Sequence, residues 1–170
     1  MTDGSCPRVI QKWESVGPED TAALAAALAD LLGPGDVVTL RGDLGTGKTT
    51  LTRALARALG ITDRITSPTF ALAQRYDGTV PLVHIDLYRL AGVDAEELGL
   101  LFDDSIDAVT VVEWPEQIGA GIPTPRVGIM LRHAGGDRRL VALEGADAAT
   151  RSRLADIVAD LRSRHLDSEP

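Results

Sequence analysis

Residues 42–49 have types and a spacing suited to holding phosphate, because they follow the pattern G-x-x-x-x-G-K-[ST]. In such a loop the glycines let backbone N–H groups converge on phosphate oxygens, where a side chain would clash. Lys48 is expected to reach the β- and γ-phosphates, and the Thr49 hydroxyl is a candidate ligand for Mg²⁺. The residues expected to contact a bound nucleotide along this loop are Asp43, Leu44, Gly45, Thr46, Gly47, Lys48, Thr49 and Thr50.

The segments on either side of the loop match the strand–loop–helix arrangement that the motif needs. Residues 36–40 form a short apolar, β-branched run that predicts a buried strand. Residues 48–59 carry apolar side chains at helical spacing, and Gly60 follows as the expected C′ residue. The positive end of this helix would therefore face the phosphates. The alternative interpretation is a glycine-rich turn with a solvated lysine.

Two acidic residues end apolar segments, where a second anchor for Mg²⁺ is expected. Asp86 ends the segment Leu-Val-His-Ile-Asp, and Glu113 ends the segment Val-Thr-Val-Val-Glu. Both would emerge at the carboxyl edge of a sheet, and Mg²⁺ prefers such hard oxygen ligands. One acid would hold the metal, directly or through water, while the other orients an attacking water. The alternative for each acid is a solvated strand end, or a salt bridge to Arg89 or Lys48.

Three further features have both a chemical and a structural interpretation. Pro68 favours extended geometry in the segment 67–69, whose Thr69 hydroxyl is a candidate sensor of the γ-phosphate or simply part of a rigid turn. Trp114 either covers the sheet edge or offers a surface to a partner. The three histidines form no metal-like cluster in the sequence, and His84 is expected to be structural.

The composition is that of a soluble globular protein, and a length of 170 residues predicts a single domain, 1–170. The net charge of −8 argues against broad, unaided binding to nucleic acid or to an anionic membrane. With one cysteine, Cys6, we expect no intrachain disulfide and no cysteine-based zinc site. No apolar run approaches the roughly 18 residues of a membrane span, and the N-terminus lacks a signal-peptide pattern. These features favour a cytoplasmic enzyme or ATP-driven switch.

The remaining segments predict a mixed order of helices and strands. Gly17-Pro18 begins a helix that ends at 33–35, and Asp94 with Glu97 predicts the start of another. Asp77-Gly78 and Gly135-Gly136 are turn signals that predict two hairpins. The expected further elements are strands at 8–13, 70–76, 80–86, 108–113, 127–132 and 138–143, and a terminal helix at 150–166. This order predicts a three-layer α/β domain, P-loop NTPase-like, with a mixed central β-sheet.

Four segments occur in an order that resembles the bacterial TsaE (YjeE) family. They are the loop at 42–50, Ser-Pro-Thr-Phe at 67–70, His-Ile-Asp-Leu-Tyr-Arg-Leu at 84–90 and Val-Glu-Trp-Pro at 112–115. The D-L-Y-R and E-W-P segments at this spacing are more specific than the loop, and the resemblance runs from about residue 15 to about residue 145.

The resemblance implies an ATPase, with ATP and Mg²⁺ bound, that serves the threonylcarbamoyladenosine modification of tRNA. It also implies two partner proteins. TsaD would transfer the threonylcarbamoyl group to the adenosine beside the tRNA anticodon, and TsaB would belong to the same complex. Direct contact of this acidic chain with tRNA would be weak or absent.

Carried over by position, the resemblance also implies roles for individual residues. Lys48, Asp86 and Glu113 form the expected catalytic group, and Thr49 with Glu113 forms the expected Mg²⁺ site. Nucleotide contacts are also implied outside the loop, in the first helix and the second hairpin, at Thr21 and at Arg138 or Gly136.

Two other classes of protein use such a loop. A small-molecule kinase would need an acceptor pocket and a mobile lid with arginines, but no arginine follows Glu113 before Arg126. A regulatory GTPase would need the guanine-reading sequence N-K-x-D, which the sequence lacks. The kinase is therefore the main alternative to an ATPase subunit.

Overall fold

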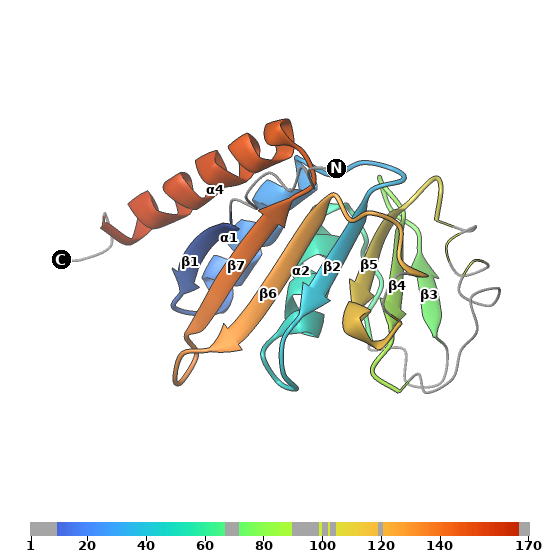
Figure 1. The fold of residues 1–170 in the computed structure, drawn as a ribbon, viewed down its shortest axis with the longest axis horizontal. Coiled ribbons are helices and arrows are strands. Elements are labelled where there is room, and N and C mark those ends of the chain that lie inside the picture. Colours follow the sequence, from blue (N-terminus) through green and yellow to red (C-terminus); the bar gives the residue numbers. More distant parts are fainter. Residues whose placement is uncertain are drawn as a thin grey trace, which may run out of the picture.

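A seven-stranded β-sheet forms the centre of the molecule in the computed structural model, which describes residues 10–66, 72–89, 99, 102, 105–118 and 121–166 (Figure 1). The strands are β1 (Ile10–Ser15), β2 (Val37–Arg41), β3 (Ala73–Tyr76), β4 (Leu82–Asp86), β5 (Val109–Glu113), β6 (Val127–His133) and β7 (Arg139–Gly145). The helices are α1 (Pro18–Ala29), α2 (Lys48–Ala58), α4 (Ala148–Leu166) and the short 3₁₀ turn η1 (Pro115–Gln117).

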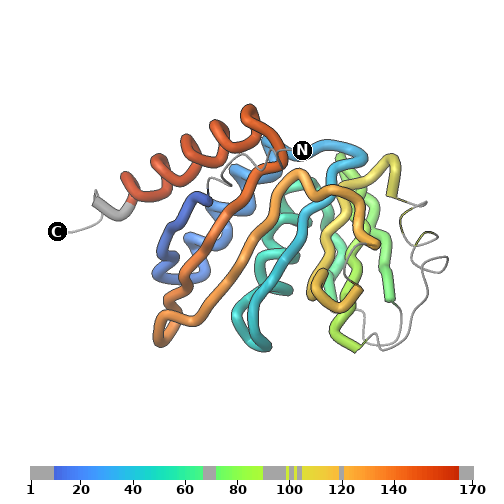
Figure 2. The backbone as a smooth tube through the Cα atoms, in the orientation of Figure 1, coloured from blue at the N-terminus to red at the C-terminus, as the bar shows by residue number. Residues whose placement is uncertain are grey.

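The sheet is mixed, as predicted, and its strand order is β1-β7-β6-β2-β5-β4-β3. The strand β2 lies between β6 and β5 and is parallel to both, and β4 is parallel to β5. The strands β1, β7 and β3 run antiparallel to their neighbours. The parallel strands therefore end at one edge of the sheet. The β2–α2 loop and the β6–β7 hairpin extend from this same edge (Figure 2).

The helices α1, α2 and α4 pack on one face of the sheet, where the larger apolar cluster lies. The helices contribute Leu28, Leu55 and Leu154, and the strands contribute Val38 and Leu143, all nearly inaccessible to solvent. These helix positions belong to the apolar faces that the sequence pattern predicts. Burial of these apolar side chains fixes how α2 lies against β2. It therefore also fixes the direction in which the loop between them points.

The opposite face of the sheet, over β2, β4 and β5, carries a second apolar cluster. The side chains that pack against it from outside the sheet include Phe102, Ile118 and Ile122. Within the part of the chain that the structure describes, this third layer is therefore mostly irregular, whereas the helices cover the other face. The helix predicted from Asp94 lies almost entirely outside the described residues.

The two predicted hairpins both form, and the connections between their last paired residues are 77–81 and 134–138. They differ in the conformation of their glycines. Gly135 and Gly136 have positive φ angles of 94° and 53°, as a tight turn between β6 and β7 requires. The β3–β4 register pairs Tyr76 with Leu82, so residues 77–81 connect these strands rather than the predicted 77–79, and Gly78 does not have a positive φ. Gly78 serves close packing there, because an added Cβ would lie 2.5 Å from the Ile61 side chain.

The C-terminal helix α4 begins after a capping aspartate. Asp147 Oδ1 accepts a hydrogen bond from the backbone N–H of Thr150 at 2.7 Å, and this bond holds the pKa of Asp147 below its ordinary value. The apolar side of α4 packs against β1 and β7. Among the described residues, no helix is both long and apolar enough to cross a lipid bilayer.

Candidate active site

The loop between β2 and α2 has the backbone conformation that its glycines allow. Gly42, Gly45 and Gly47 have φ angles of 137°, 79° and 103°, which other residues rarely adopt. Gly42 also meets β6 closely, because an added Cβ would lie 2.2 Å from the Leu131 carbonyl oxygen. Gly47 is the N-cap of α2 and has no side chain with which to cap the first turn. The N–H groups at this helix end can therefore point to an anion.

Lys48 lies inside the loop rather than in solvent. Its side chain is buried, and its ammonium donates to the carbonyls of Gly42 at 2.7 Å and Asp43 at 2.9 Å. The Trp114 ring covers the ammonium, with 4.0 Å between Nζ and the ring centroid. Burial lowers the pKa of Lys48, and nearby carboxylates, Glu113 first, oppose this change. The predicted phosphate-binding lysine is thus held in place by its own loop.

Trp114 adopts a conformation that is rare for a bulky residue. Its φ and ψ are 59° and 48°, in the left-handed region, where a residue other than glycine costs about 1–3 kcal/mol. The Trp114 N–H donates to the Leu40 carbonyl at 3.1 Å, and the ring packs at 4.9 Å from the Tyr88 ring. Trp114 therefore covers the sheet edge, which is the first interpretation that the sequence offers, and Tyr88 beside it is 47% exposed. A surface for a partner at Trp114 stays a prediction.

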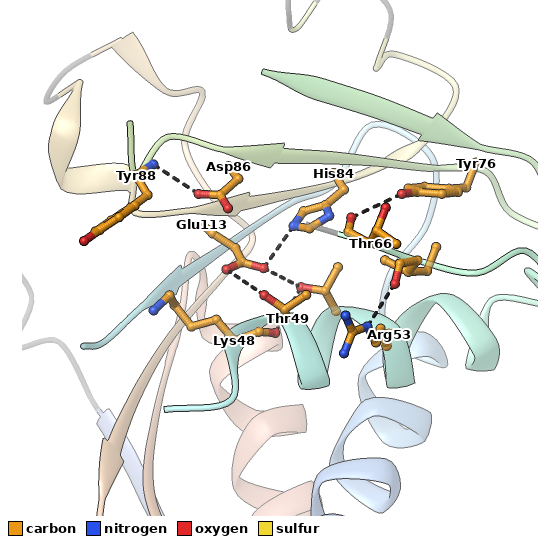
Figure 3. A network of polar contacts seen from close by, with 11 residues as sticks. Lys48, Thr49, Arg53, Thr66, Tyr76, His84, Asp86, Tyr88 and Glu113 are labelled. Carbon is orange, nitrogen blue, oxygen red and sulfur yellow. Dashed lines mark hydrogen bonds and ion pairs between the residues drawn. The ribbon is translucent and has the colours of Figure 1, made fainter. Parts of the chain in front are cut away.

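Glu113 is the centre of the polar contacts beneath the loop (Figure 3). The residue is only 2% exposed at the end of β5. Its Oε2 accepts from the Thr49 hydroxyl at 3.3 Å, and its Oε1 lies 2.9 Å from His84 Nε2 and 3.3 Å from the Thr52 hydroxyl. Glu113 is therefore neither a solvated strand end nor a salt-bridge partner of Lys48.

Asp86 stands beside Glu113 at the carboxyl edge. The parallel pairing of β4 with β5 places Asp86 opposite Glu113 in register. Asp86 is only partly buried, and its Oδ1 accepts from the Tyr88 N–H at 3.1 Å. The structure thus brings together the three residues of the predicted catalytic group, which are the buried Glu113, the more accessible Asp86 and Lys48.

The oxygens of Thr49 and Glu113 fit a magnesium ion. Two adjacent ligands of an octahedral Mg²⁺, each bonded at about 2.1 Å, lie about 3 Å apart. The observed separation of Thr49 Oγ1 and Glu113 Oε2 is 3.3 Å. Within the described residues there is no cluster of three or more histidines, cysteines or acids that could hold a metal. Such a cation would therefore depend on phosphate oxygens and water for the rest of its ligands, as in other P-loop sites.

A cavity of about 140 Å³ adjoins the loop, between α1 and the β6–β7 hairpin. Thr21, which the resemblance assigns to the nucleotide, lines this cavity together with Thr46 and Thr50. Asp137 lines it from the β6–β7 hairpin. The cavity therefore extends the predicted loop contacts toward the first helix and the second hairpin.

The hairpin contributes Arg139 to this cavity, whereas Arg138 and Gly136, the two alternatives that the resemblance implies, do not line it. Arg139 lines the cavity and donates from Nε to the Thr46 carbonyl at 3.0 Å and from Nη1 to the Gly136 carbonyl at 2.9 Å. Arg138 forms an exposed ion pair with Glu14 at 2.7 Å. Neighbouring residues along a strand point to opposite sides. A shift of one residue in this alternation therefore decides which of the two arginines faces the cavity.

One predicted site residue, Leu44, differs from the others in being an exposed large apolar residue. Leu44 lies at the tip of the loop and is 71% exposed, so it is available to a ligand or a partner. The segment 67–69, with the candidate sensor Thr69, lies outside the described residues.

The contact of His84 with Glu113 was not predicted, although the period-two alternation places His84 and Asp86 on the same face of β4.

The fold and this site define a P-loop NTPase-like protein, with a strand–glycine loop–helix unit at the carboxyl edge of a mixed sheet and an acid on the neighbouring strand. The profile of one family, described as threonylcarbamoyl adenosine biosynthesis protein TsaE, matches residues 16–141. The chain belongs to this family.

Individual relatives agree with this membership. The tRNA threonylcarbamoyladenosine biosynthesis protein TsaE of Bacillus subtilis is 45% identical over 129 residues, which cover 75% of this chain and 81% of the relative. The protein of the same name from Streptomyces coelicolor is 45% identical over 119 residues, covering 67% and 80%. The crystal structure of Bacillus subtilis YdiB superposes with a TM-score of 0.72 at 36% identity and covers 95% of this chain and 99% of its own.

Proposed function

We propose that this protein is the ATP-binding and ATP-hydrolysing subunit required for the threonylcarbamoyladenosine modification of tRNA, at the adenosine adjacent to the anticodon. Membership of the TsaE family supports the pathway. The observation that carries the ATPase assignment is the convergence of Lys48, Thr49 and Glu113 at the N-terminus of α2. This is the arrangement in which P-loop proteins hold a nucleotide and its metal.

The phosphates would lie in the concavity of the loop, against the N-terminus of α2. Phosphoryl transfer passes through a loose transition state with its charge spread over the phosphoryl oxygens, so positioned positive groups dominate catalysis. Lys48 supplies one such group, and its carbonyl contacts and the Trp114 ring hold its ammonium in place. Bound Mg²⁺, held by Thr49 and Glu113, would neutralise further charge.

Asp86 is the residue best placed to orient an attacking water. It is the more accessible of the two acids, and it lies in register with Glu113 at the sheet edge. The oxygens of Glu113 already have three neighbours within hydrogen-bonding distance. We therefore assign water positioning to Asp86 and metal binding to Glu113, which divides the two roles that the sequence leaves open.

The nucleobase would occupy the cavity beside the loop. Its lining by Thr21, Thr50 and Arg139 offers hydrogen-bonding groups, and Trp13 and Leu24 add apolar surface. The sequence lacks the guanine-reading segment, so we propose adenine as the base.

The partners would be TsaD- and TsaB-like proteins. The net charge of −8 makes strong direct binding of tRNA unfavourable, and the partner proteins would supply that contact. We also propose a cytoplasmic location, since the modified molecule is tRNA. Hydrolysis should be slow for the isolated chain and rise in the partner complex.

A competition titration tests the nucleotide assignment. Purified protein should bind ADP and ATP with Mg²⁺ more tightly than GDP and GTP, and it should hydrolyse ATP slowly. Equal or tighter binding of GTP would contradict the ATPase assignment. Fast turnover by the isolated chain, with a small-molecule acceptor consumed, would favour the kinase instead.

A further inference from the structure

His84 is a completely buried histidine whose one polar contact among the described residues is with Glu113. Its exposed fraction is 0%, and Nε2 lies 2.9 Å from Glu113 Oε1. The other ring nitrogen, Nδ1, is buried and has no hydrogen-bond partner among the described residues. Burial of an imidazole with one nitrogen unsatisfied costs free energy, so packing alone gives no physical reason for a histidine at this position.

The two carboxylate oxygens of Glu113 have different neighbours. Oε2 faces the Thr49 hydroxyl at 3.3 Å, whereas Oε1 faces His84 and Thr52. The Thr52 hydroxyl has one proton and two acceptors, the Lys48 carbonyl at 3.1 Å and Glu113 Oε1 at 3.3 Å. The carbonyl is the nearer acceptor, so His84 Nε2–H is the donor committed to Oε1.

We propose that His84 is a positioning residue for the metal site: it holds Oε1 of Glu113 so that Oε2 is presented beside Thr49. This inference rests on the proposed function, because Thr49 and Glu113 are the Mg²⁺ ligands proposed there. Hydrogen bonds from groups behind a ligand commonly fix its orientation in metal sites.

Attraction between the Glu113 carboxylate and the Lys48 ammonium favours a competing arrangement, which His84 opposes. Among the neighbouring carboxylates, Glu113 has the largest Coulombic effect on Lys48. A carboxylate freed from His84 could rotate toward the ammonium and form a salt bridge there. In that arrangement Oε2 would no longer lie beside Thr49. His84 thus keeps Glu113 available to the cation and Lys48 available to phosphate.

The test compares ADP affinity in Mg²⁺ and in EDTA for wild-type protein, His84→Met and His84→Gln. The methionine variant fills the space but cannot donate, whereas the glutamine amide can donate an N–H to Oε1. We expect His84→Met to reduce the gain in affinity from Mg²⁺ by about 10–100-fold and leave the EDTA value unchanged. His84→Gln should retain most of the gain. A merely structural role would lower thermal stability without a selective effect on the Mg²⁺-dependent part.

The possible outcomes separate the inference from the proposed function. If wild-type protein gains affinity from Mg²⁺ and His84→Met gains as much, the role of His84 is wrong while the nucleotide site stands. If wild-type protein gains nothing from Mg²⁺, the proposed metal site fails, and this inference fails with it.

A second measurement decides the question if His84→Met does not fold. ¹⁵N-histidine spectra of a folded chain with the other two histidines replaced by glutamine should show Nε2 protonated and Nδ1 unprotonated. Glu113→Ala should then increase the exchange rate of the Nε2 proton with water. The opposite tautomer, or an exchange rate independent of Glu113, would overturn the inference.

Discussion

Replacement of Lys48 by alanine tests the phosphate site most sharply. The substitution removes a buried ammonium that donates to the Gly42 and Asp43 carbonyls and lies 4.0 Å from the Trp114 ring centroid. It leaves the strand β2 and the apolar face of α2 unchanged. We therefore expect the fold to persist and nucleotide binding to be strongly weakened.

The size of the loss follows from the charge that is removed. An ammonium and a phosphate charge about 4 Å apart attract by about 4 kcal/mol at an effective dielectric constant of about 20. Burial already disfavours the charged form of Lys48, so desolvation offsets part of this attraction. We expect a net loss of about 3 kcal/mol, which corresponds to ATP binding weakened by about a hundredfold or more.

Isothermal titration with Mg²⁺-ATP, at equal ionic strength for all variants, measures this loss. Lys12, the only other lysine of the chain, lies on β1 and provides a matched control. Lys12→Ala should bind ATP as wild-type protein does. A Lys48→Ala protein that is folded and binds within fivefold of wild type would refute the assignment, and so would an equal loss in both variants.

Three further predictions concern the neighbouring parts of the structure. Arg139→Ala should weaken ADP binding by about tenfold in a titration, because one charged hydrogen bond to the loop is worth about 1.5 kcal/mol or more, whereas Arg138→Ala should change it less than twofold. A larger loss of ADP affinity in Arg138→Ala than in Arg139→Ala would favour Arg138, which the resemblance implies, as the nucleotide contact. Gly42→Ala should lower the free energy of unfolding by at least about 2 kcal/mol, because its Cβ would clash with β6 at a positive φ, and the control Gly33→Ala, which has open space, should not. Equal denaturation midpoints for Gly42→Ala and Gly33→Ala would contradict this prediction, because they would show that the loop relaxes to accept the added Cβ. The lowered pKa of Asp147 means that its charged form contributes stability above about pH 3.9, the ordinary value, and that this contribution disappears as the pH falls through the native pKa. Thermal unfolding of wild type and Asp147→Asn should therefore differ at pH 7, and the difference should shrink as the pH falls below about 3.9. A constant difference would contradict this cap.

Local patterns predict much of this fold because each one expresses a nearby physical constraint. The loop at 42–49 needs a strand before it and a helix after it, and both form close to the predicted ends. The glycines 135 and 136 specify their own turn through positive φ. Asp77-Gly78 gives the same signal, but Gly78 does not have a positive φ, and it packs closely against Ile61.

The parts that could not be predicted depend on contacts between distant segments. The position of β2 between β5 and β6 sets which strand ends meet, and no short sequence pattern encodes this order. The contact between His84 and Glu113 depends on the register of β4 against β5. From the sequence alone, His84 is expected to be structural and Glu113 to bind a metal, and nothing connects the two. Likewise, the phase of β7 decides whether Arg138 or Arg139 faces the loop.

The same limits apply to the candidate site. The positions of Lys48, Thr49 and the two acids at one edge of the sheet could be predicted, because the proposed roles require specific residue types at the ends of specific elements. Their environment could not, since the burial of Glu113 and the cover that Trp114 gives Lys48 arise from packing.

Reconstituted tRNA modification measures the central proposal most directly. TsaD- and TsaB-like partners, tRNA, ATP and a threonylcarbamoyl donor would be combined with wild-type chain, with Lys48→Ala or with neither, and modified adenosine counted per TsaD-like protein. We predict repeated turnover with the wild-type chain only. Equal turnover with Lys48→Ala, or without the chain at all, would contradict the proposal that ATP hydrolysis at this loop supports the modification.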